Sequence, residues 1–149
     1  RHSLLSISLA IACTPLPATA QSLFGVALGN TGEQARQEVR EGRLIQRTNG
    51  AALLMGSDRH VELCNDRVVA VSENVGTTLN DFAAMAKNEM VDRGQGLTIV
   101  QNDRTSSGEI SIVTFKWQES RSITYEVSAI YGLGKLTVSR GYWATSACK

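Results

Sequence analysis

His60 and its sequence neighbours come nearest in this chain to a set of residues that could do chemistry. Asp58 precedes His60 by two residues, Glu62 follows it by two, and Ser57 is close by. An imidazole oriented by a carboxylate can act as a general base, so these residues make a hydrolase one candidate function. The sequence supplies neither an oxyanion site nor a nucleophile turn beside them, and a solvated hairpin end explains the same residue types. We therefore predict no catalytic residue.

The sequence carries no motif that would hold a metal or a nucleotide. A closed zinc site needs a second histidine or a Cys-x-x-Cys pair near His60, and the sequence has neither there. The acidic residues around Asp103 do not alternate as a calcium loop requires. Gly25, Gly29 and Gly32 lack the spacing of a dinucleotide fingerprint, and turns explain them better. We predict no metal and no cofactor.

Residues 1–20 have the organisation of a secretory signal peptide. A basic first residue is followed by an apolar run over Leu4–Ala12 and by a small-x-small cleavage site at Ala18–Ala20. We expect a mature chain that begins at Gln21 and is periplasmic or secreted. A lipoprotein acylated at Cys13 is the alternative. No later stretch approaches the roughly 20 apolar residues of a transmembrane helix, so we expect no such segment.

The charge of the remaining chain is balanced. Removing the first residue leaves 15 − 1 = 14 basic residues against 14 acidic ones. Binding to nucleic acid or to an anionic membrane surface draws its affinity from clustered Lys and Arg, so this balance argues against both. Residues 21–149 are long enough to bury the core of a single domain.

Cys64 and Cys148 are the two cysteines that follow the export signal. In an oxidising compartment this pair predicts one disulfide, which would tie the end of the chain to its first half. The alternative is two buried free thiols.

Two helices are predicted, at residues 32–41 and 78–93. The first has a capping-box spacing in Thr31 and Gln34 but a thin apolar face. The second has a continuous apolar stripe and ends at Gly94, a residue type that accepts the left-handed cap conformation. The second helix therefore has the clearer face to pack on a core.

Strand-forming runs separated by short polar or glycine-rich connections predict hairpins. The predicted strands are residues 43–48, 51–55, 60–64, 67–72, 97–101, 109–117, 123–131 and 135–143. The fold class that follows is α+β, with two helices packed on one face of an antiparallel sheet of about eight strands.

The two halves of the chain share one order of elements. Residues 24–73 and 75–143 each place an apolar residue, a glycine and two polar residues before a helix and four strands. Leu28–Thr31 thereby aligns with Val75–Thr78. A duplicated helix-and-four-strand unit is one interpretation; the other is that helix starts and ends resemble one another in all proteins.

The segment Phe24–Thr31, the short helix after it and the hairpin series ending at Val61–Val69 resemble a group of bacterial exported modules. These are typified by the small lipoprotein of β-barrel assembly and by β-lactamase inhibitory proteins. The resemblance covers mainly residues 24–72. It implies a helical segment packed on an antiparallel sheet, tandem copies, and a protein-binding role without chemistry. This chain differs in having one short helix where those units have a pair, and in lacking a good lipobox.

The second half alone is similar to the helix-plus-sheet arrangement of the photosystem accessory (PsbP) and Ran-binding group. That similarity implies the same kind of layer architecture and adds no site residue.

Three aromatic residues, Trp117, Tyr142 and Trp143, are the candidates for partner contact, because Trp and Tyr are enriched where proteins touch one another. Closing the end of the core is the alternative role of these rings. We predict a non-catalytic protein-binding module of the bacterial envelope, acting as a scaffold or an inhibitor. A binder of a small apolar ligand or lipid between helix and sheet is the second candidate, and the hydrolase using His60 is the third.

Overall fold

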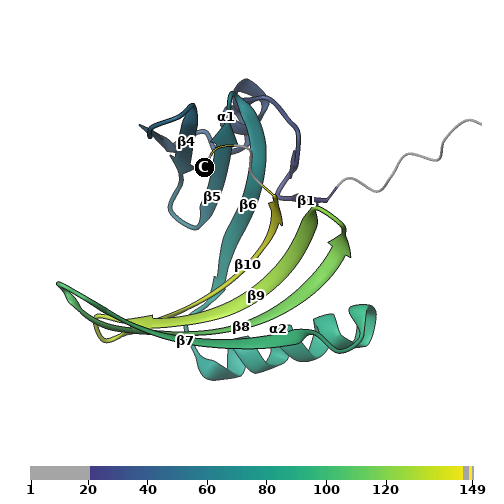
Figure 1. The fold of residues 1–149 in the computed structure, drawn as a ribbon, viewed down its shortest axis with the longest axis vertical. Helices are drawn as coiled ribbons and strands as arrows, with labels where there is room; N and C mark the ends of the chain where they lie inside the picture. The colour runs from purple at the N-terminus through teal and green to yellow at the C-terminus, as the bar shows by residue number, and fades with distance from the viewer. Residues whose placement is uncertain (1–20, 146–147, 149) are drawn as a thin grey trace, which may run out of the picture.

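The structure is a computed structural model, and it describes residues 21–145 and Cys148 (Figure 1). The predicted signal peptide and Cys13 lie outside the described residues. The elements of the N-terminal part are β1 (Ser22–Leu23), β2 (Val26–Ala27), α1 (Gly32–Glu38), β3 (Arg43–Gln46), β4 (Ala51–Met55), β5 (Arg59–Cys64) and β6 (Arg67–Gly76). Those of the C-terminal part are α2 (Leu79–Arg93), β7 (Leu97–Thr105), β8 (Gly108–Ser120), β9 (Ile123–Gly132) and β10 (Lys135–Ala144).

An α+β fold with an eight-stranded antiparallel sheet confirms the predicted class. The strand order is β3-β4-β5-β6-β10-β9-β8-β7, so each half forms a meander and the two meanders meet through their last strands. The β6–β10 pairing is antiparallel, and Arg140 on β10 donates two hydrogen bonds of 2.9 and 2.7 Å to Glu73 Oε1 on β6. β1 and β2 form a separate two-stranded sheet.

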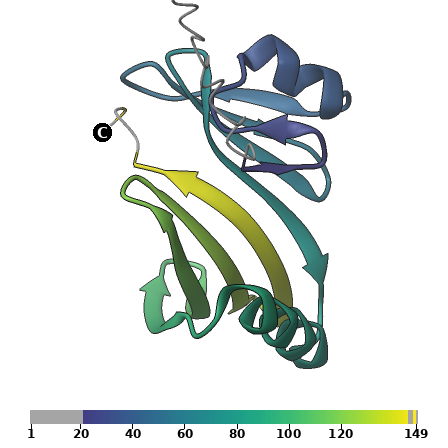
Figure 2. The ribbon, with the colours of Figure 1, turned by 90° about the vertical axis from the view of Figure 1, so that its right-hand side faces the viewer.

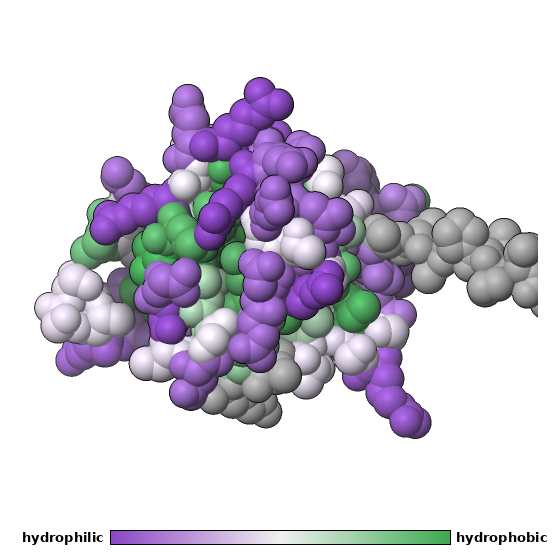
Figure 3. Space-filling view, turned by 90° about the horizontal axis from the view of Figure 1, so that it is seen from above, coloured by the Kyte–Doolittle hydropathy of each residue, from purple (hydrophilic) through white to green (hydrophobic). Residues whose placement is uncertain are grey.

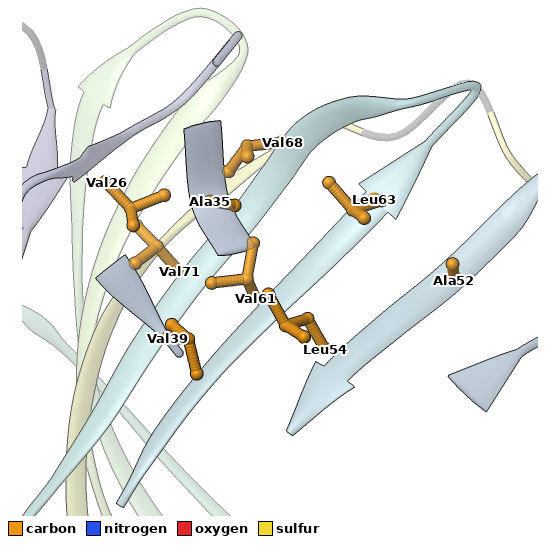
Figure 4. Close-up of a cluster of buried hydrophobic side chains, with 9 residues drawn as sticks. All are labelled: Val26, Ala35, Val39, Ala52, Leu54, Val61, Leu63, Val68 and Val71. Carbon is orange, nitrogen blue, oxygen red and sulfur yellow. The ribbon is translucent and has the colours of Figure 1, made fainter. Parts of the chain in front are cut away.

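The N-terminal unit, α1 with β3–β6, has an aliphatic core. The capping box is present: Gln34 N donates to Thr31 Oγ1 at 3.2 Å, and Thr31 N donates to Gln34 Oε1 at 2.8 Å. This core, the aliphatic cluster, is formed by Val26, Ala35, Val39, Ala52, Leu54, Val61, Leu63, Val68 and Val71 (Figure 4). Seen from above, hydrophilic side chains dominate the molecule's surface and apolar residues show between them (Figure 3).

The C-terminal unit, α2 with β7–β10, has an aromatic core. Trp117, Tyr125 and Val127 form its buried centre, the aromatic cluster, and Phe82, Met85 and Met90 of α2 pack against it. Neighbouring rings of this cluster stand 4.8–6.2 Å apart, within the range of favourable aromatic pairs. Phe82, Ala86 and Met90 of the predicted stripe therefore face the sheet, whereas Leu79 and Ala83 of that stripe are exposed.

Both helices cover the same face of the sheet (Figure 2). Val71 on β6 is the register partner of Tyr142 on β10, which in turn pairs with Tyr125 on β9. Directly paired residues of antiparallel strands point to one face. α1 packs over the cluster that contains Val71, and α2 over the cluster that contains Tyr125. Tyr142 touches both clusters, so one continuous core runs beneath the two helices.

Several element boundaries differ from the prediction. The helix predicted to end at residue 41 ends at Glu38. The connection predicted at residues 102–108 is mostly strand, because β7 continues to Thr105 and pairs with Gly108 across a two-residue turn. Nearly all the side chains of this extension are exposed, so the extension carries no hydrophobic alternation. Pairing with β8 holds this extension in the strand conformation, although the sequence pattern does not indicate a strand there.

The N-terminus of α2 allows a test of its cap. Thr78 N donates to Asp81 Oδ2 at 2.9 Å, and Asp81 N donates to Thr78 Oγ1 at 3.1 Å. We expect Thr78→Ala to lower the free energy of unfolding by about 1 kcal/mol, measured by urea denaturation at neutral pH. Thr78→Ser keeps the acceptor and serves as the control; a serine variant as unstable as the alanine one would contradict the role of the hydroxyl.

The same cap should depend on pH. The hydrogen bonds from the Thr78 side chain and from the amides of Thr77 and Thr78 hold the pKa of Asp81 below its usual 3.8. A lowered carboxyl pKa contributes stability that is present above the unfolded value and is lost as the pH falls through the folded value. The stability difference between the protein and Asp81→Asn should accordingly shrink below about pH 4. A difference that is constant from pH 7 to pH 3 would contradict this.

Candidate functional site

The second face of the sheet carries neither α1 nor α2. On this helix-free face the residues alternate with those of the core, so Trp143 follows Tyr142 and points to the opposite side. Thr114 and Ser128 form a buried hydroxyl pair there, 2.8 Å apart. Lys116 and Glu126 form an ion pair one step further along the same two strands. The helix-free face is therefore mixed in character, with hydroxyls, one paired charge and scattered apolar residues.

The far ends of the β7–β8 and β9–β10 hairpins extend beyond α2 (Figure 1). Ile110, Ile130 and Leu133 lie there and, with polar neighbours, line a cavity of about 300 Å³. We call these three residues the hairpin-tip patch. Ile130 and Leu133 are among the large apolar side chains of this protein that remain exposed. Apolar surface gathered at a projecting end, away from either core cluster, is typical of a contact site.

Leu133 occupies an unfavourable backbone conformation. It has φ +52° and is followed by Gly134 at φ +74°, in the two-residue connection between the paired residues Gly132 and Lys135. Positive φ at both positions defines the hairpin turn that favours Asn-Gly. A leucine there costs about 1 kcal/mol because its Cβ crowds the backbone. Its side chain is 74% exposed, so burial in this chain does not compensate.

Strand β7 forms one edge of the sheet and pairs, within the described chain, only with β8. Alternate residues of an edge strand turn their amide and carbonyl groups outward. Leu97 and Val100 on this edge are exposed apolar residues. The edge strand starts just after the C-terminus of α2 and ends at Thr105, beside the hairpin-tip patch. The outward backbone groups of β7 therefore lead up to the apolar side chains of the patch.

The structure separates the three aromatic residues singled out in the sequence. Trp117 is 5% exposed, and its Nε1 donates to the carbonyl oxygen of Gly94 at 2.9 Å. Tyr142 packs with Tyr125 and accepts a hydrogen bond from Arg93. Trp117 and Tyr142 thus both pack on Tyr125 in the aromatic core. Trp143 is half-buried on the helix-free face.

Arg93 is the centre of a polar network that sequence reasoning did not identify. Its Nε donates to Glu89 at 2.6 Å, its Nη1 pairs with Glu119, and its Nη2 donates to the Tyr142 hydroxyl at 3.1 Å. The guanidinium also lies 3.9 Å from the centre of the Tyr125 ring. The one sequence signal was the spacing of Glu89 and Arg93, which places them one helical turn apart.

Tyr125 completes this network. Its hydroxyl donates to Glu89 Oε1 at 2.7 Å. Burial, together with the bond to Glu89, raises the pKa of Tyr125 well above its ordinary value. Glu89 thus accepts one hydrogen bond from Arg93 on the helix and one from Tyr125 on the sheet. These contacts join the last turn of α2 to β8, β9 and β10.

His60 is half-buried on β5, where Met55 and Ser72 are its register partners. The ion pairs among the described residues do not include His60. Residues 21–145 and Cys148 contain no group of three or more His, Cys, Asp or Glu side chains arranged to hold a metal ion. In the same part of the chain no helix is both long and apolar enough to cross a membrane.

The predicted disulfide is present. Cys64 and Cys148 are bonded, with their Cα atoms 5.6 Å apart. The bond connects the end of β5 to the segment after β10, so it joins the N-terminal and C-terminal units.

Comparisons with known proteins found no matching family model, no similar curated protein and no similar solved structure.

Proposed function

We propose that this protein is an exported protein-binding module that docks on its partner through the hairpin-tip patch. The observation that carries the proposal is Leu133, a large apolar side chain held at φ +52° and 74% exposed at the end of a projecting hairpin. Strain at a position that asparagine would relieve points to a use for the side chain. Anchoring in a partner's apolar pocket is such a use.

The surroundings of Leu133 favour a protein partner. Ile110 and Ile130 provide aliphatic contacts beside the anchor. Among the nearby charges, Arg104 pairs with Glu109 at 2.6 Å, and Lys135 adds one positive charge. An apolar centre with a polar rim is the composition of a protein interface. Strand β7 leads away from this centre and could extend the interface through its outward backbone groups.

The role as scaffold or inhibitor, and the location in the bacterial envelope, belong to this proposal as well. The disulfide supports an oxidising compartment. The resemblance of residues 24–72 to the assembly lipoprotein and to β-lactamase inhibitory proteins supports binding without chemistry. The order of one helix and four strands, occurring twice, agrees with the tandem copies of those modules.

The substitution Leu133→Asn tests the proposal, because stability and binding should change in opposite directions. Asparagine tolerates positive φ, so the free energy of unfolding should rise by about 1 kcal/mol in urea denaturation. A partner captured from envelope extract by the wild-type chain should be lost. A photo-crosslinking residue at Lys135 should attach to that same partner in the wild-type background.

Leu79→Asn is the matched control, since Leu79 is an exposed leucine at the start of α2, outside the patch. Capture should survive in this variant. Equal recovery of one partner by wild type and Leu133→Asn would refute docking through the patch, as would a crosslink that does not form at Lys135.

A further inference from the structure

A second cavity lies on the helix-free face, near the other end of the long strands. It has a volume of about 270 Å³ and spans three neighbouring strands. Lys116 on β8 forms one side, Thr124 and Glu126 on β9 form the floor, and Trp143 on β10 forms the opposite side. This volume lies just below the roughly 300–1,000 Å³ of ordinary small-molecule pockets, so the cavity can hold no more than a ligand of about one ring.

Because residue 141 is a glycine, the indole of Trp143 can lie close to the backbone of its own strand, β10. A Cβ at position 141 would stand 2.5 Å from Trp143 Cη2 and 2.6 Å from the carbonyl oxygen of Val71. Such distances exclude any side chain. The ring therefore lies over Gly141 and forms part of the apolar lining of the cavity.

Lys116 and Glu126 make the cavity polar without giving it a net charge. Their ion pair measures 3.1 Å, and both side chains are partly exposed. The ammonium retains hydrogen-bond donors, the carboxylate retains acceptors, and the hydroxyl of Thr124 can do either. A charged ligand would find no unpaired countercharge here. A wholly apolar ligand would bury the ion pair without replacing its water, which is unfavourable.

An uncharged ring with an apolar face and a polar rim can contact the indole of Trp143 and the polar side chains of the cavity at the same time. The carbon-bound hydrogens of a pyranose can lie against the indole, and its hydroxyls can exchange hydrogen bonds with Lys116, Glu126 and Thr124. We propose that this cavity binds an uncharged pyranose, either free or as one unit of a glycan. This site is separate from the hairpin-tip patch and does not depend on it.

Tryptophan fluorescence of the full chain can test this site. The protein has two tryptophans, and Trp117 is buried on the other face, so a response to ligand reports on Trp143. Titration with the methyl glycosides of glucose, galactose, mannose and N-acetylglucosamine should give a saturable change with at least one of them. The expected dissociation constant is on the order of millimolar, as a ring of this size in a shallow site permits.

Three variants make the result specific. Trp143→Leu should abolish binding, followed by saturation-transfer NMR because the fluorescent reporter is gone. Glu126→Gln should weaken it roughly fivefold by removing a charged acceptor. Leu133→Asn should bind the glycoside as the wild type does, which separates this site from the proposed docking function. The inference is overturned if no glycoside gives a saturable response up to about 100 mM, or if Trp143→Leu, folded by circular dichroism, binds like the wild type.

Discussion

Replacing Cys148 with serine is expected to lower the free energy of unfolding by about 4 kcal/mol. The Cys64–Cys148 bond spans a sequence separation of 84 residues, and a cross-link of that length removes much of the freedom of the unfolded chain. Cys148 is the better site for the substitution because it is half-buried, whereas Cys64 lies in the interior. Urea denaturation of both proteins under oxidising conditions measures the difference.

The control for this prediction is the double variant Cys64→Ala/Cys148→Ser. Alanine at position 64 avoids burying a hydroxyl without a partner. The double variant should unfold close to the single one, and adding a reductant should destabilise the wild type but neither variant. Identical unfolding midpoints for the wild type with and without reductant would show that the bond adds nothing to stability.

Replacing Arg93 with methionine is expected to lower the free energy of unfolding by about 2 to 3 kcal/mol. The guanidinium pairs with both Glu89 and Glu119, and the side chains of Arg93 and Glu89 are only 23% and 13% exposed. Removing one member of a fully buried pair costs about 3–5 kcal/mol, and the remaining exposure here reduces that figure. Methionine keeps much of the packing on Tyr125, so the loss reports mainly on charge and hydrogen bonds.

Two further variants define the role of Arg93. Arg93→Lys retains the charge, but an ammonium lacks the planar set of donors of the guanidinium and stacks less well on the Tyr125 ring. Its loss of unfolding free energy should therefore be intermediate between wild type and Arg93→Met. Combining Arg93→Met with Glu89→Gln should recover part of the stability, because an amide oxygen can still accept from the Tyr125 hydroxyl and only Glu119 is then left as a carboxylate that has lost its partner. A double-mutant cycle measures this coupling.

Arg104→Met is the matched control for charge removal. Arg104 also pairs with a glutamate, Glu109, but the two side chains are 82% and 72% exposed. An exposed pair of this kind contributes less than about 1 kcal/mol. If Arg93→Met were as mild as Arg104→Met, the network beneath α2 would have no structural importance.

The hairpins and helices could be predicted because their signals are local. The cap at Thr78, the stripe of α2 and the Asn-Gly turn before β4 each depend on residues within a few positions of one another. Their ends were less predictable. The exposed extension of β7 to Thr105 is fixed by its partner strand rather than by its own composition.

The candidate site depended on contacts that no local pattern contains. Alternation along β10 puts Tyr142 and Trp143 on opposite faces, but it does not say which face a helix covers. The sequence therefore grouped Trp117, Tyr142 and Trp143, while the structure encloses the first two beneath α2 and leaves Trp143 on the helix-free face. The spacing of Glu89 and Arg93 places them one helical turn apart, yet Glu119 and Tyr142 reach Arg93 only through folding.

The sequence by itself was enough to predict the α+β class, the antiparallel hairpins and a Cys64–Cys148 disulfide, since these predictions depend on composition, short-range spacing and the two cysteines that follow residue 20. Only the tertiary structure decided that β6 and β10 join the two meanders, that the covered face is the one carrying Tyr142 and not Trp143, and that the turn carrying Leu133 lies beyond α2. The physical reason is that strand pairing across a long loop and the choice of the covered face are settled by packing between distant segments.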